Sequence, residues 1–376
     1  WQELYSWYKR QPQWQYRVEE LMKSGFYTRS ADGLTEEVAK QLYGEHFQDS
    51  ITRIERFSAC AFAHFLTYGL RLREQQTYEF QPLDLGNVCH SALEYYSRKL
   101  REEHLSWTEI EEEKRQEYID DSVEHAISDY GNSVLYSSAR NEYMIERIKR
   151  LLTRTIWALT KQLEAGDFVP VAYEMRFENG KIDRVDLCKD GDKVYVKVLD
   201  YKTGSKAFDV VALYHGLQLQ LMVYMDAAVK MTQKHYPDSD VIPAGIFYYR
   251  LNDPFVEKEV VGEEEEIWQK VLKELKVDGV MNLKDETLEH LDHCQVGESA
   301  VIPVKYNKNG SLSKNSKVAS EQEFEVMMRH ALGKVLKVHR KILSGEVAAS
   351  PYRRKQESGC DYCAYRHICG FDQKIP

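Results

Sequence analysis

Two short motifs place acidic and basic side chains at a spacing that suits metal-dependent hydrolysis. The first is Gly-Lys-Ile-Asp-Arg-Val-Asp at 180–186, and the second is Leu-Asp-Tyr-Lys-Thr-Gly at 199–204. The residues between them alternate in polarity and are interrupted by an Asp-Gly dipeptide at 190–191, which is typical of a tight hairpin turn. We therefore predict two antiparallel strands that bring Asp183 directly across from Asp200, or one diagonal away, on the same face.

Lys202 follows Asp200 on the same face because side chains two residues apart in a strand point the same way. Two carboxylates held about 5 to 8 Å apart raise one pKa unless a cation lies between them. Mg²⁺ prefers such hard oxygen ligands, and it would supply an activated water for cleaving a phosphodiester. In this arrangement Lys202 steadies the developing charge, or acts instead as the general base. Each acid taken alone is better explained as an ordinary exposed residue at a strand or turn, but the two together favour a metal site.

Length and composition indicate a folded protein of ordinary type. The chain has 376 residues, enough for one large domain or two smaller ones, and 43% of them are apolar. No run approaches a membrane span, and the first residues do not resemble a signal peptide, so we expect a cytoplasmic protein without a membrane segment. Because the chain begins at Trp1 without an initiator Met, we expect a piece of a longer polypeptide.

Charge patterning leaves a role in binding nucleic acid open. The net charge of -9 argues against a surface that grips DNA everywhere, because phosphates attract Lys and Arg. Residues 299–320 nevertheless contain four lysines and no acid, at Lys305, Lys308, Lys314 and Lys317. This basic strip suits a DNA channel, and lysines in a solvated loop are an equally good explanation.

The periodicity of apolar residues predicts an α/β fold, a mixed sheet flanked by helices. Residues 1–48 read as helical segments, and an amphipathic helix over 51–66 carries Cys60 within it or at its end. We expect strands at 169–177, 181–188, 193–199 and 242–251. Further helices are expected from the cap at Asp84 through His90, as two long helices within 107–165, and at 211–233, 264–276 and 321–344.

A second constellation is the spacing Cys-x2-Cys-x5-Cys near the C-terminal end, at Cys360, Cys363 and Cys369. Three thiols so close together usually share a metal, and zinc and iron–sulfur sites both need a fourth donor. Spacing does not choose between the two, although zinc is the commoner default. The candidates for the fourth donor are Cys60, His367 and Cys294, whereas Cys89 and Cys188 read better as core residues.

The first array resembles the RecB-type branch of the PD-(D/E)xK nucleases over residues of about 50 to 370. The matching positions, in the order of the family, are His90, Asp183, Asp200, Lys202, Gln220 and Tyr224. The resemblance implies a restriction-endonuclease-like core with helical insertions. It also implies that His90 and the backbone carbonyl of Tyr201 are metal ligands beside Asp183 and Asp200, and that Gln220 contacts the site or the DNA.

The cysteine pattern is similar to that of the AddB family, which belongs to the bacterial AddAB helicase–nucleases. By that resemblance Cys60, Cys360, Cys363 and Cys369 hold a 4Fe-4S cluster that staples together the two ends of a nuclease domain at 49–376. Residues 1–48 would then be the helical tail of a preceding helicase-like region.

The resemblance also implies a function. We expect an Mg²⁺-dependent DNA exonuclease, with Mn²⁺ or Ca²⁺ able to occupy the same site, acting on a single strand or a duplex end. It would degrade the 5′-ended strand during double-strand break processing for homologous recombination, in a heterodimer with an AddA-like helicase–nuclease subunit. One alternative is a free-standing Cas4-like or Dna2-like iron–sulfur nuclease. Another is a catalytically inactive nuclease fold that only binds DNA, which the intact Asp183, Asp200 and Lys202 argue against.

Overall fold

The computed structural model describes residues 1–25, 33–44, 50–73, 82–135, 139–254, 264–294 and 296–371. The chain divides into two compact units, each described by itself. The smaller unit comprises residues 1–45, 59–72 and 341–376, and the larger unit comprises residues 46–58 and 73–340. The domain boundary expected near residue 48 lies within 45–49, outside the described residues, and stays a prediction.

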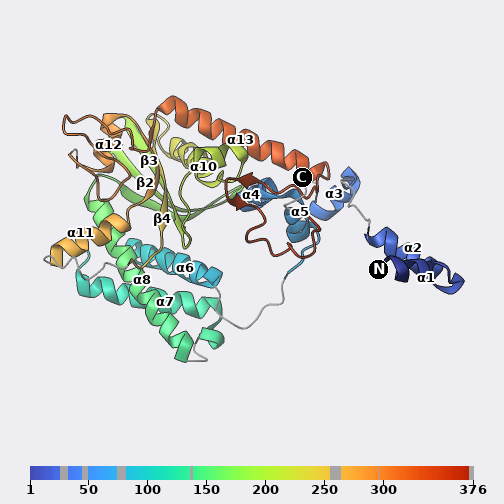
Figure 1. Ribbon diagram of the computed structural model, residues 1–376. Coiled ribbons are helices and arrows are strands. Elements are labelled where there is room, and N and C mark those ends of the chain that lie inside the picture. Colours follow the sequence, from blue (N-terminus) through green and yellow to red (C-terminus); the bar gives the residue numbers. More distant parts are fainter. Residues whose placement is uncertain are drawn as a thin grey trace. The chain divides into compact units, whose positions relative to one another are not determined.

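The larger unit is built on a mixed six-stranded sheet in the order β1-β2-β3-β4-β5-β6, which agrees with the predicted fold class (Figure 1). Strands β1 to β3 form an antiparallel meander, β3 and β4 are parallel, β4 and β5 are antiparallel, and β5 and β6 are parallel. The strands are β1 Val169–Phe177, β2 Gly180–Asp190, β3 Lys193–Lys202, β4 Asp240–Arg250, β5 Asp278–Asn282 and β6 Val318–Ala319.

The hairpin between β2 and β3 has the register that the sequence predicts. Asp190 pairs with Lys193, and Gly191 between them has φ 57°, a conformation that glycine adopts at no steric cost. The register runs back to the pair Arg184 and Leu199. The paired ladder ends there, and continuing its register by one residue sets Asp183 opposite Asp200, in agreement with the first of the two predicted alternatives.

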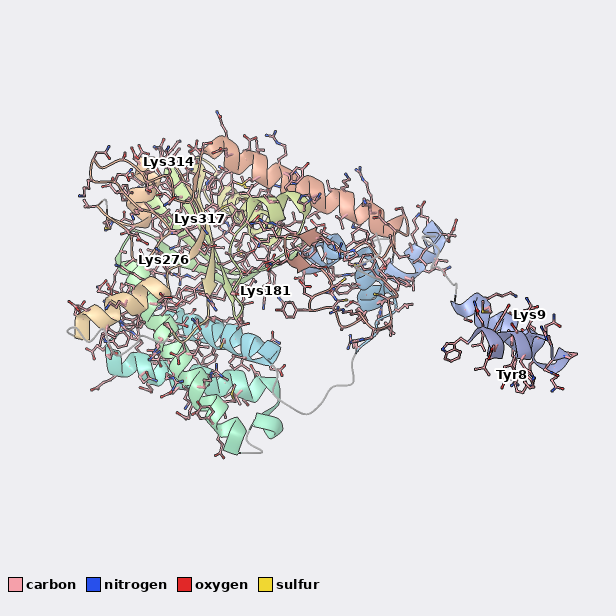
Figure 2. The ribbon with its side chains drawn as sticks, viewed as in Figure 1. Tyr8, Lys9, Lys181, Lys276, Lys314 and Lys317 are labelled. Carbon is pink, nitrogen blue, oxygen red and sulfur yellow. The ribbon has the colours of Figure 1, made fainter. Side chains whose placement is uncertain are left out.

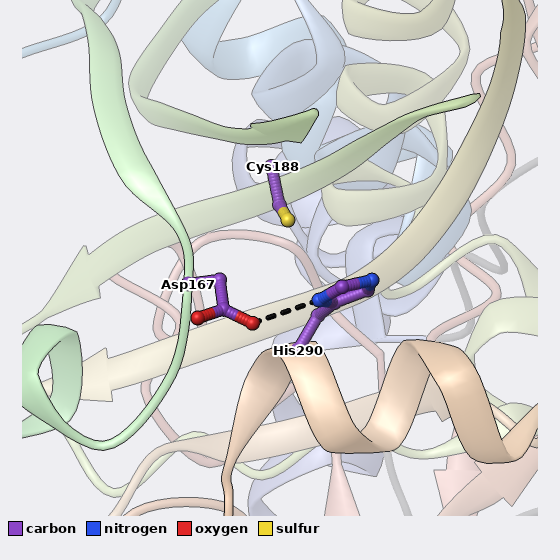
Figure 3. Close-up of side chains that lie close together, drawn as sticks. All are labelled: Asp167, Cys188 and His290. Atoms are coloured by element: carbon purple, nitrogen blue, oxygen red, sulfur yellow. Dashed lines mark hydrogen bonds and ion pairs between the residues drawn. The ribbon is translucent and has the colours of Figure 1, made fainter. Parts of the chain in front are cut away.

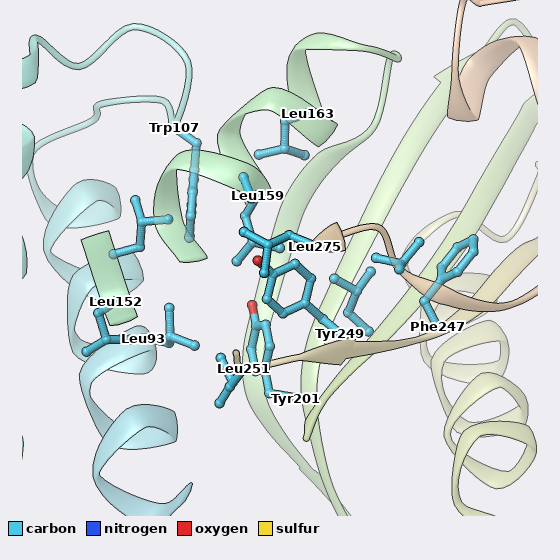
Figure 4. Packing of buried hydrophobic residues seen from close by; sticks show 14 of the residues in the cluster. Leu93, Trp107, Leu152, Leu159, Leu163, Tyr201, Phe247, Tyr249, Leu251 and Leu275 are labelled. Carbon is cyan, nitrogen blue, oxygen red and sulfur yellow. The ribbon is translucent and has the colours of Figure 1, made fainter. Parts of the chain in front are cut away.

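Helices cover both faces of this sheet (Figure 1). The helices α6 Pro82–Glu102, α7 Glu112–Leu135 and α8 Ala139–Glu164 lie on one side, and α10 Gln220–His235 lies on the other. The two long helices predicted within 107–165 are thus confirmed. Figure 4 shows the core between the first three helices and the sheet, in which apolar and tyrosine side chains interdigitate, among them Leu93, Trp107, Leu152, Leu159, Tyr201, Tyr249 and Leu251.

The predicted helix over 211–233 is two helices instead of one. The short helix α9 Val210–His215 ends at Gly216, whose φ of 83° is the left-handed conformation that terminates helices. Helix α10 then begins at Gln220. The carboxylate of Glu55 accepts hydrogen bonds from the backbone N–H groups of Leu219 and Gln220, at 2.7 and 3.1 Å, and thereby fixes where α10 starts.

The remaining helices of the larger unit are α4 Ile51–Ala59, α11 Glu264–Glu274, α12 Asp285–Leu291 and α13 Glu321–Leu343. Of α4 only residues 51–58, and of α13 only residues 321–340, belong to this unit. Strand β5 was not predicted. Its Gly279 lies so close to β4 that a Cβ would come within 1.9 Å of the carbonyl oxygen of Ile246. A glycine at this position reads as a loop signal in the sequence, although here it permits close pairing.

The smaller unit contains short elements around the cysteines. Its helices are α1 Gln2–Lys9, α2 Pro12–Gly25, α3 Glu36–Tyr43 and α5 Ala61–His64, followed by a π-helical turn Phe65–Gly69, and its strands are β7 Arg353–Arg354 and β8 Glu357–Ser358. The predicted helix over 51–66 is interrupted at Cys60, which has extended backbone angles. Tyr8 and Lys9, which Figure 2 labels, lie on the exposed α1. Among the helices described in either unit, none has the length and apolar character needed to cross a bilayer.

Candidate active site

Asp200 is a buried carboxylate at the end of β3. Its exposed fraction is 1%, and it forms an ion pair with the ammonium group of Lys202. Apart from this ion pair, neither carboxylate oxygen has a hydrogen-bond partner among the described residues. Burial first, and then the charge of Asp183, raise the pKa of Asp200 to about 7, against the opposing effect of Lys202. A buried carboxylate without donors is costly unless a cation lies beside it.

Asp183 is oriented by two neighbouring elements. Its Oδ2 accepts a hydrogen bond of 2.7 Å from the backbone N–H of Tyr201, which joins β2 to β3 between the candidate ligands. The same oxygen lies 3.4 Å from Nδ1 of His90, which projects from α6. The other ring nitrogen of His90 lies 3.1 Å from the backbone carbonyl oxygen of Tyr201. The structure therefore brings His90, Asp183 and the Tyr201 carbonyl together as the family pattern predicts.

Glu174 on β1 completes this cluster, and it was not predicted from the sequence. Its Oε1 lies 3.6 Å from Nδ1 of His90, and the donor atoms of His90, Glu174 and Asp183 all lie within 4.8 Å of one another. Burial lowers the pKa of His90, but the hydrogen bonds and charges of Asp183 and Glu174 outweigh it and raise the pKa to about 10. The two carboxylates therefore favour the protonated form of the ring.

The backbone at Glu174 is strained, with φ 47° for a residue that has a Cβ. The pairs that flank it, Tyr173 with Arg184 and Met175 with Ile182, set it opposite Asp183. Its side chain is 7% exposed and forms an ion pair with Lys181. Strain of this kind persists where the surroundings impose it, commonly at functional sites. The available sequence signal was an acid in the middle of a predicted strand, which by itself is weak.

The side chain of Gln220 is hydrogen-bonded to Tyr224. Its side-chain amide donates a 2.7 Å hydrogen bond to the hydroxyl oxygen of Tyr224 one turn further along α10. Burial raises the pKa of Tyr224, the hydrogen bond with Gln220 opposes this, and the charges of Asp200 and Asp183 raise it further, so this phenol lies near both carboxylates. Gln220 thus reaches the site through Tyr224, the two residues that the family pattern pairs.

The donor set fits a hard divalent cation. Two carboxylates, a backbone carbonyl and one imidazole are ligands that suit Mg²⁺ or Mn²⁺. The structural observation behind this fit is the buried Asp200 carboxylate, whose oxygens have no hydrogen-bond partner among the described residues apart from the ion pair with Lys202.

The four cysteines of the second constellation line one small pocket in the smaller unit, namely Cys60, Cys360, Cys363 and Cys369. Their two segments are joined by the backbone: the N–H of Tyr352 donates to the carbonyl of Ala59 at 2.9 Å. Gly359 allows this approach, since a Cβ there would lie 2.8 Å from the same carbonyl oxygen. The chain is therefore arranged to bring Cys60 to the C-terminal thiols.

The pKa of Cys60 reflects the closeness of the other thiols. Burial raises the pKa of Cys60, backbone N–H groups of Ala63 and Phe62 oppose the shift, and the charges of Cys363 and Cys360 raise it again. The thiols are therefore near enough to repel one another when ionised, and a cationic group would relieve that repulsion.

The other cysteines and His367 are placed elsewhere. His367 is exposed and is not among the residues that line the pocket. Cys294 belongs to the larger unit, where its thiol donates to the carbonyl of Val296. Cys89 and Cys188 are buried in the core of that unit, as predicted, although Cys188 has polar neighbours that the sequence did not reveal.

The basic strip is partly neutralised. Lys317 forms an ion pair with Asp278 of β5, and just outside the strip Lys276 lies 2.9 Å from Glu298. Lys314 is exposed, and Figure 2 labels it together with Lys276 and Lys317. Isolated bridges between Glu298 and Lys305 and between Tyr306 and Leu312 order the segment. The basic strip is therefore a structured segment that retains exposed lysines.

The fold and this site define a nuclease: the chain belongs to the PD-(D/E)XK nuclease superfamily, whose sequence profile matches residues 48–370. It is similar to an ATP-dependent helicase/deoxyribonuclease subunit of Lachnoclostridium phytofermentans, with 39% identity over 393 residues, covering 100% of this chain and 34% of the relative. The corresponding proteins of Caldanaerobacter subterraneus subsp. tengcongensis and Clostridium perfringens are each 32% identical over 392 and 405 residues, covering 99% and 100% of this chain and 34% of each relative.

The chain thus spans about a third of the length of the curated relatives it matches. The resemblance to RecB-type nucleases and to the AddB family that the motifs indicated is confirmed.

Proposed function

We propose that this chain is a metal-dependent deoxyribonuclease domain that hydrolyses phosphodiester bonds of DNA. The observation that carries the proposal is the Asp200 carboxylate, which is buried next to Asp183 and has Lys202 as its ion-pair partner but no hydrogen-bond partner among the described residues. Two neighbouring buried carboxylates cost stability unless cations compensate them, so the pair points to a bound cation. The superfamily assignment and the names of the relatives, which include deoxyribonuclease, support the same activity.

Asp183, Asp200, His90 and the carbonyl oxygen of Tyr201 would hold the cation, which we take to be Mg²⁺, with Mn²⁺ or Ca²⁺ able to bind at the same place. Once bound, it would lower the pKa of a water molecule and polarise the scissile phosphate. Glu174 positions His90, because its carboxylate lies against Nδ1 of that ring.

Lys202 contributes positive charge at the site. Its ammonium is held beside the Asp200 carboxylate and above the ring of Tyr248, 5.8 Å from the centroid. A carboxylate and the face of an aromatic ring both attract a cation and hold this ammonium in place. We therefore assign Lys202 to stabilising the charge that develops on the phosphate rather than to general-base catalysis. Gln220 and Tyr224 form the wall of the site on the α10 side.

We also propose that Cys60, Cys360, Cys363 and Cys369 hold a 4Fe-4S cluster. Four thiolates on one zinc ion would have their sulfurs about 3.8 Å apart in tetrahedral geometry. Among the described residues, the groups of three donors within 4.8 Å of one another include none of these four cysteines. The absence of such a close group of three among the described cysteines, together with the resemblance of the cysteine pattern to that of the AddB family, supports an iron–sulfur cluster over a single zinc ion. A colourless anaerobic preparation that contains zinc without iron or labile sulfide would overturn this assignment.

The wider role that we propose follows from the relatives, which are named as helicase/deoxyribonuclease subunits. In this role the domain acts in the cytoplasm on DNA beside an AddA-like helicase–nuclease subunit and degrades the 5′-ended strand during double-strand break processing for recombination. The free-standing Cas4-like or Dna2-like nuclease ranks second, because these relatives align with the chain over nearly its whole length. The inactive DNA-binding scaffold ranks third, because the acids and Lys202 converge.

Strand cleavage by the Asp200→Ala variant tests the activity. The assay uses the assembled helicase–nuclease complex with Mg²⁺ and end-labelled DNA. We expect the variant to lose at least about 100-fold in cleavage rate. Asp238→Ala, which changes an exposed acid between α10 and β4, serves as the matched control and should cleave at the parent rate. Unchanged cleavage by Asp200→Ala would contradict the proposal, and absence of cleavage by the parent complex would favour the scaffold alternative.

A further inference from the structure

A second group of metal-binding donor types lies in the larger unit, outside the candidate active site. Asp167, Cys188 and His290 place a carboxylate oxygen, a thiol sulfur and a ring nitrogen within 4.8 Å of one another. Figure 3 shows the three side chains pointing toward a common centre, with the ion pair between Asp167 Oδ2 and His290 Nδ1 at 2.8 Å. They come from three separate elements: the connector after α8, strand β2 and helix α12.

The backbone holds two of these elements together independently of the side chains. The N–H of Asp167 donates to the carbonyl of His290, and the N–H of His293 donates to the carbonyl of Ala165, both at 2.8 Å. Gly166 between them has no room for a side chain, because a Cβ would come within 2.3 Å of the His290 carbonyl oxygen. These two backbone hydrogen bonds hold the segments that carry Asp167 and His290 in a fixed relative position before any ligand binds.

The third donor, Cys188, is supplied by the sheet. It is 4% exposed and lies five residues along β2 from Asp183. An odd separation puts the two side chains on opposite faces of the strand, roughly 16 Å apart along it. The group around Cys188 is therefore distinct from the candidate active site.

Other groups surround the three donors. Nε2 of His293 lies 3.1 Å from the second oxygen of Asp167, and Oδ2 of Asp190 lies 3.6 Å from Nε2 of His290. The carboxylate of Asp167 is thus oriented through its outer oxygen, as carboxylate ligands commonly are. The nearby ammonium of Lys197 is paired with Asp186 at 2.8 Å and leaves the thiol available.

We propose that Asp167, Cys188 and His290 form a binding site for a divalent transition metal of the zinc class. Mixed sulfur, nitrogen and oxygen donors select borderline metals such as Zn²⁺ and disfavour Mg²⁺ and Ca²⁺, which require oxygen ligands. Three protein ligands leave the fourth tetrahedral position to water. When the metal binds, the Cys188 thiol releases its proton to solvent and the thiolate sulfur forms the bond. The ion would fasten α12 and the connector after α8 to β2, near its hairpin turn.

Metal analysis of the full chain tests the site, with Zn²⁺ as the probe and excess Mg²⁺ present to occupy the candidate active site. We expect the parent protein to retain one more equivalent of zinc than Cys188→Ser after equilibrium dialysis. With Co²⁺ in place of Zn²⁺, a thiolate-to-cobalt absorption band should accompany binding in the parent and be missing in Cys188→Ser. His293→Gln should weaken zinc binding by about 10- to 100-fold, because it loosens Asp167 without removing a ligand.

One control and one further test variant complete the experiment. Cys294→Ser removes an exposed thiol next to His293 in the sequence and should bind as the parent does. His290→Gln leaves the buried Cys188 in place, so that it reports on the site even if Cys188→Ser fails to fold, and it should also lose the extra equivalent. Equal zinc content in the parent, Cys188→Ser and His290→Gln would overturn the proposal and leave only a hydrogen-bonded Asp–His pair.

Discussion

The carboxylate of Asp183 accepts a hydrogen bond of 2.7 Å from the backbone N–H of Tyr201, the residue between Asp200 and Lys202. This bond crosses from β2 to β3 at the point where the two acids face each other. It fixes Asp183 relative to the neighbouring strand, and it leaves the other oxygen of Asp183 and Oδ1 of Asp200 to bind a cation, while Oδ2 of Asp200 is paired with Lys202. The hairpin therefore organises the site before metal or DNA is present.

The role of Lys202 is tested by two substitutions. Lys202→Met should lower the rate of strand cleavage by about 100- to 1,000-fold, since it removes the charge that stabilises the transition state. Lys202→Arg keeps the charge but does not deprotonate in proteins. We expect it to retain cleavage well above Lys202→Met. If both variants are equally inactive while still binding metal, Lys202 is the general base and our assignment is wrong.

Glu174 is expected to matter although it is not a residue of the family pattern. Glu174→Gln keeps the size of the side chain but removes the charge that orients His90, and it should weaken activation by Mg²⁺ by about 10- to 100-fold. The measurement is the cleavage rate as a function of Mg²⁺ concentration, with partial recovery at high Mg²⁺. Glu178→Gln, an exposed acid just beyond β1, should match the parent at every concentration. If the cleavage rate of Glu174→Gln depends on Mg²⁺ concentration as that of the parent does, Glu174 has no role in the site.

The acids could be predicted from sequence for a simple physical reason. A glycine at the turn of a two-residue hairpin fixes the register, and register fixes which side chains face each other. His90 and Gln220 lie on separate helices, so only the family pattern connects them to Asp183. Glu174 stayed hidden because its role depends on an unusual backbone conformation. Cys188 was predicted as a core residue, which it is, but its polar neighbours come from Asp167 and His290, distant in sequence.

Helices with a long apolar periodicity could be predicted from the sequence. Elements whose limits depend on contacts with distant residues could not. The long helices α7 and α8 follow from repeated apolar spacing. The break between α9 and α10 depends on Gly216 and on the carboxylate of Glu55, which caps α10 from a distant part of the sequence. Strand β5 is only five residues long and depends on its pairing with β4. Such tertiary contacts override local preference.

A buried ion network predicts how stability depends on pH. The guanidinium of Arg184 donates to Asp186 at 2.6 and 3.0 Å, and Lys197 lies 2.8 Å from the same carboxylate. Burial would raise the pKa of Asp186, but the charges of Arg184 and Lys197 outweigh it and lower the pKa. Since the pKa is lower in the folded state than in the unfolded state, the stabilisation is fully present above about pH 4 and is lost as the pH falls through the folded pKa.

Urea unfolding between about pH 6 and pH 3 measures this dependence. We expect the free energy of unfolding to fall with acid in the parent and to fall less steeply in Asp186→Asn. At neutral pH that variant should be less stable by about 3 to 5 kcal/mol, because it leaves Arg184 and Lys197 buried without their carboxylate. An equally steep acid response in both proteins would show that other carboxylates dominate.

Gly359 is expected to control retention of the cluster. In Gly359→Ala the new methyl group meets the carbonyl oxygen of Ala59, which pushes the segment of Cys360 away from that of Cys60 at a cost of roughly 1 to 3 kcal/mol. Iron and labile sulfide per chain should fall relative to the parent. Gly333→Ala is the matched control: it lies in α13 with nothing within 4 Å of the added carbon, and it should retain the cluster and gain about 0.4 to 1 kcal/mol. Full iron content in Gly359→Ala would count against the proposed arrangement.

The most direct test of the central claim, that Asp183 and Asp200 jointly hold a divalent cation, is anomalous diffraction from crystals of the full chain soaked with Mn²⁺. We predict one manganese peak bonded to both carboxylates, to a ring nitrogen of His90 and to the carbonyl oxygen of Tyr201, and no such peak in Asp200→Asn. A parent protein in which Lys202 still fills this position without manganese, or in which the ion binds away from the two aspartates, would contradict it.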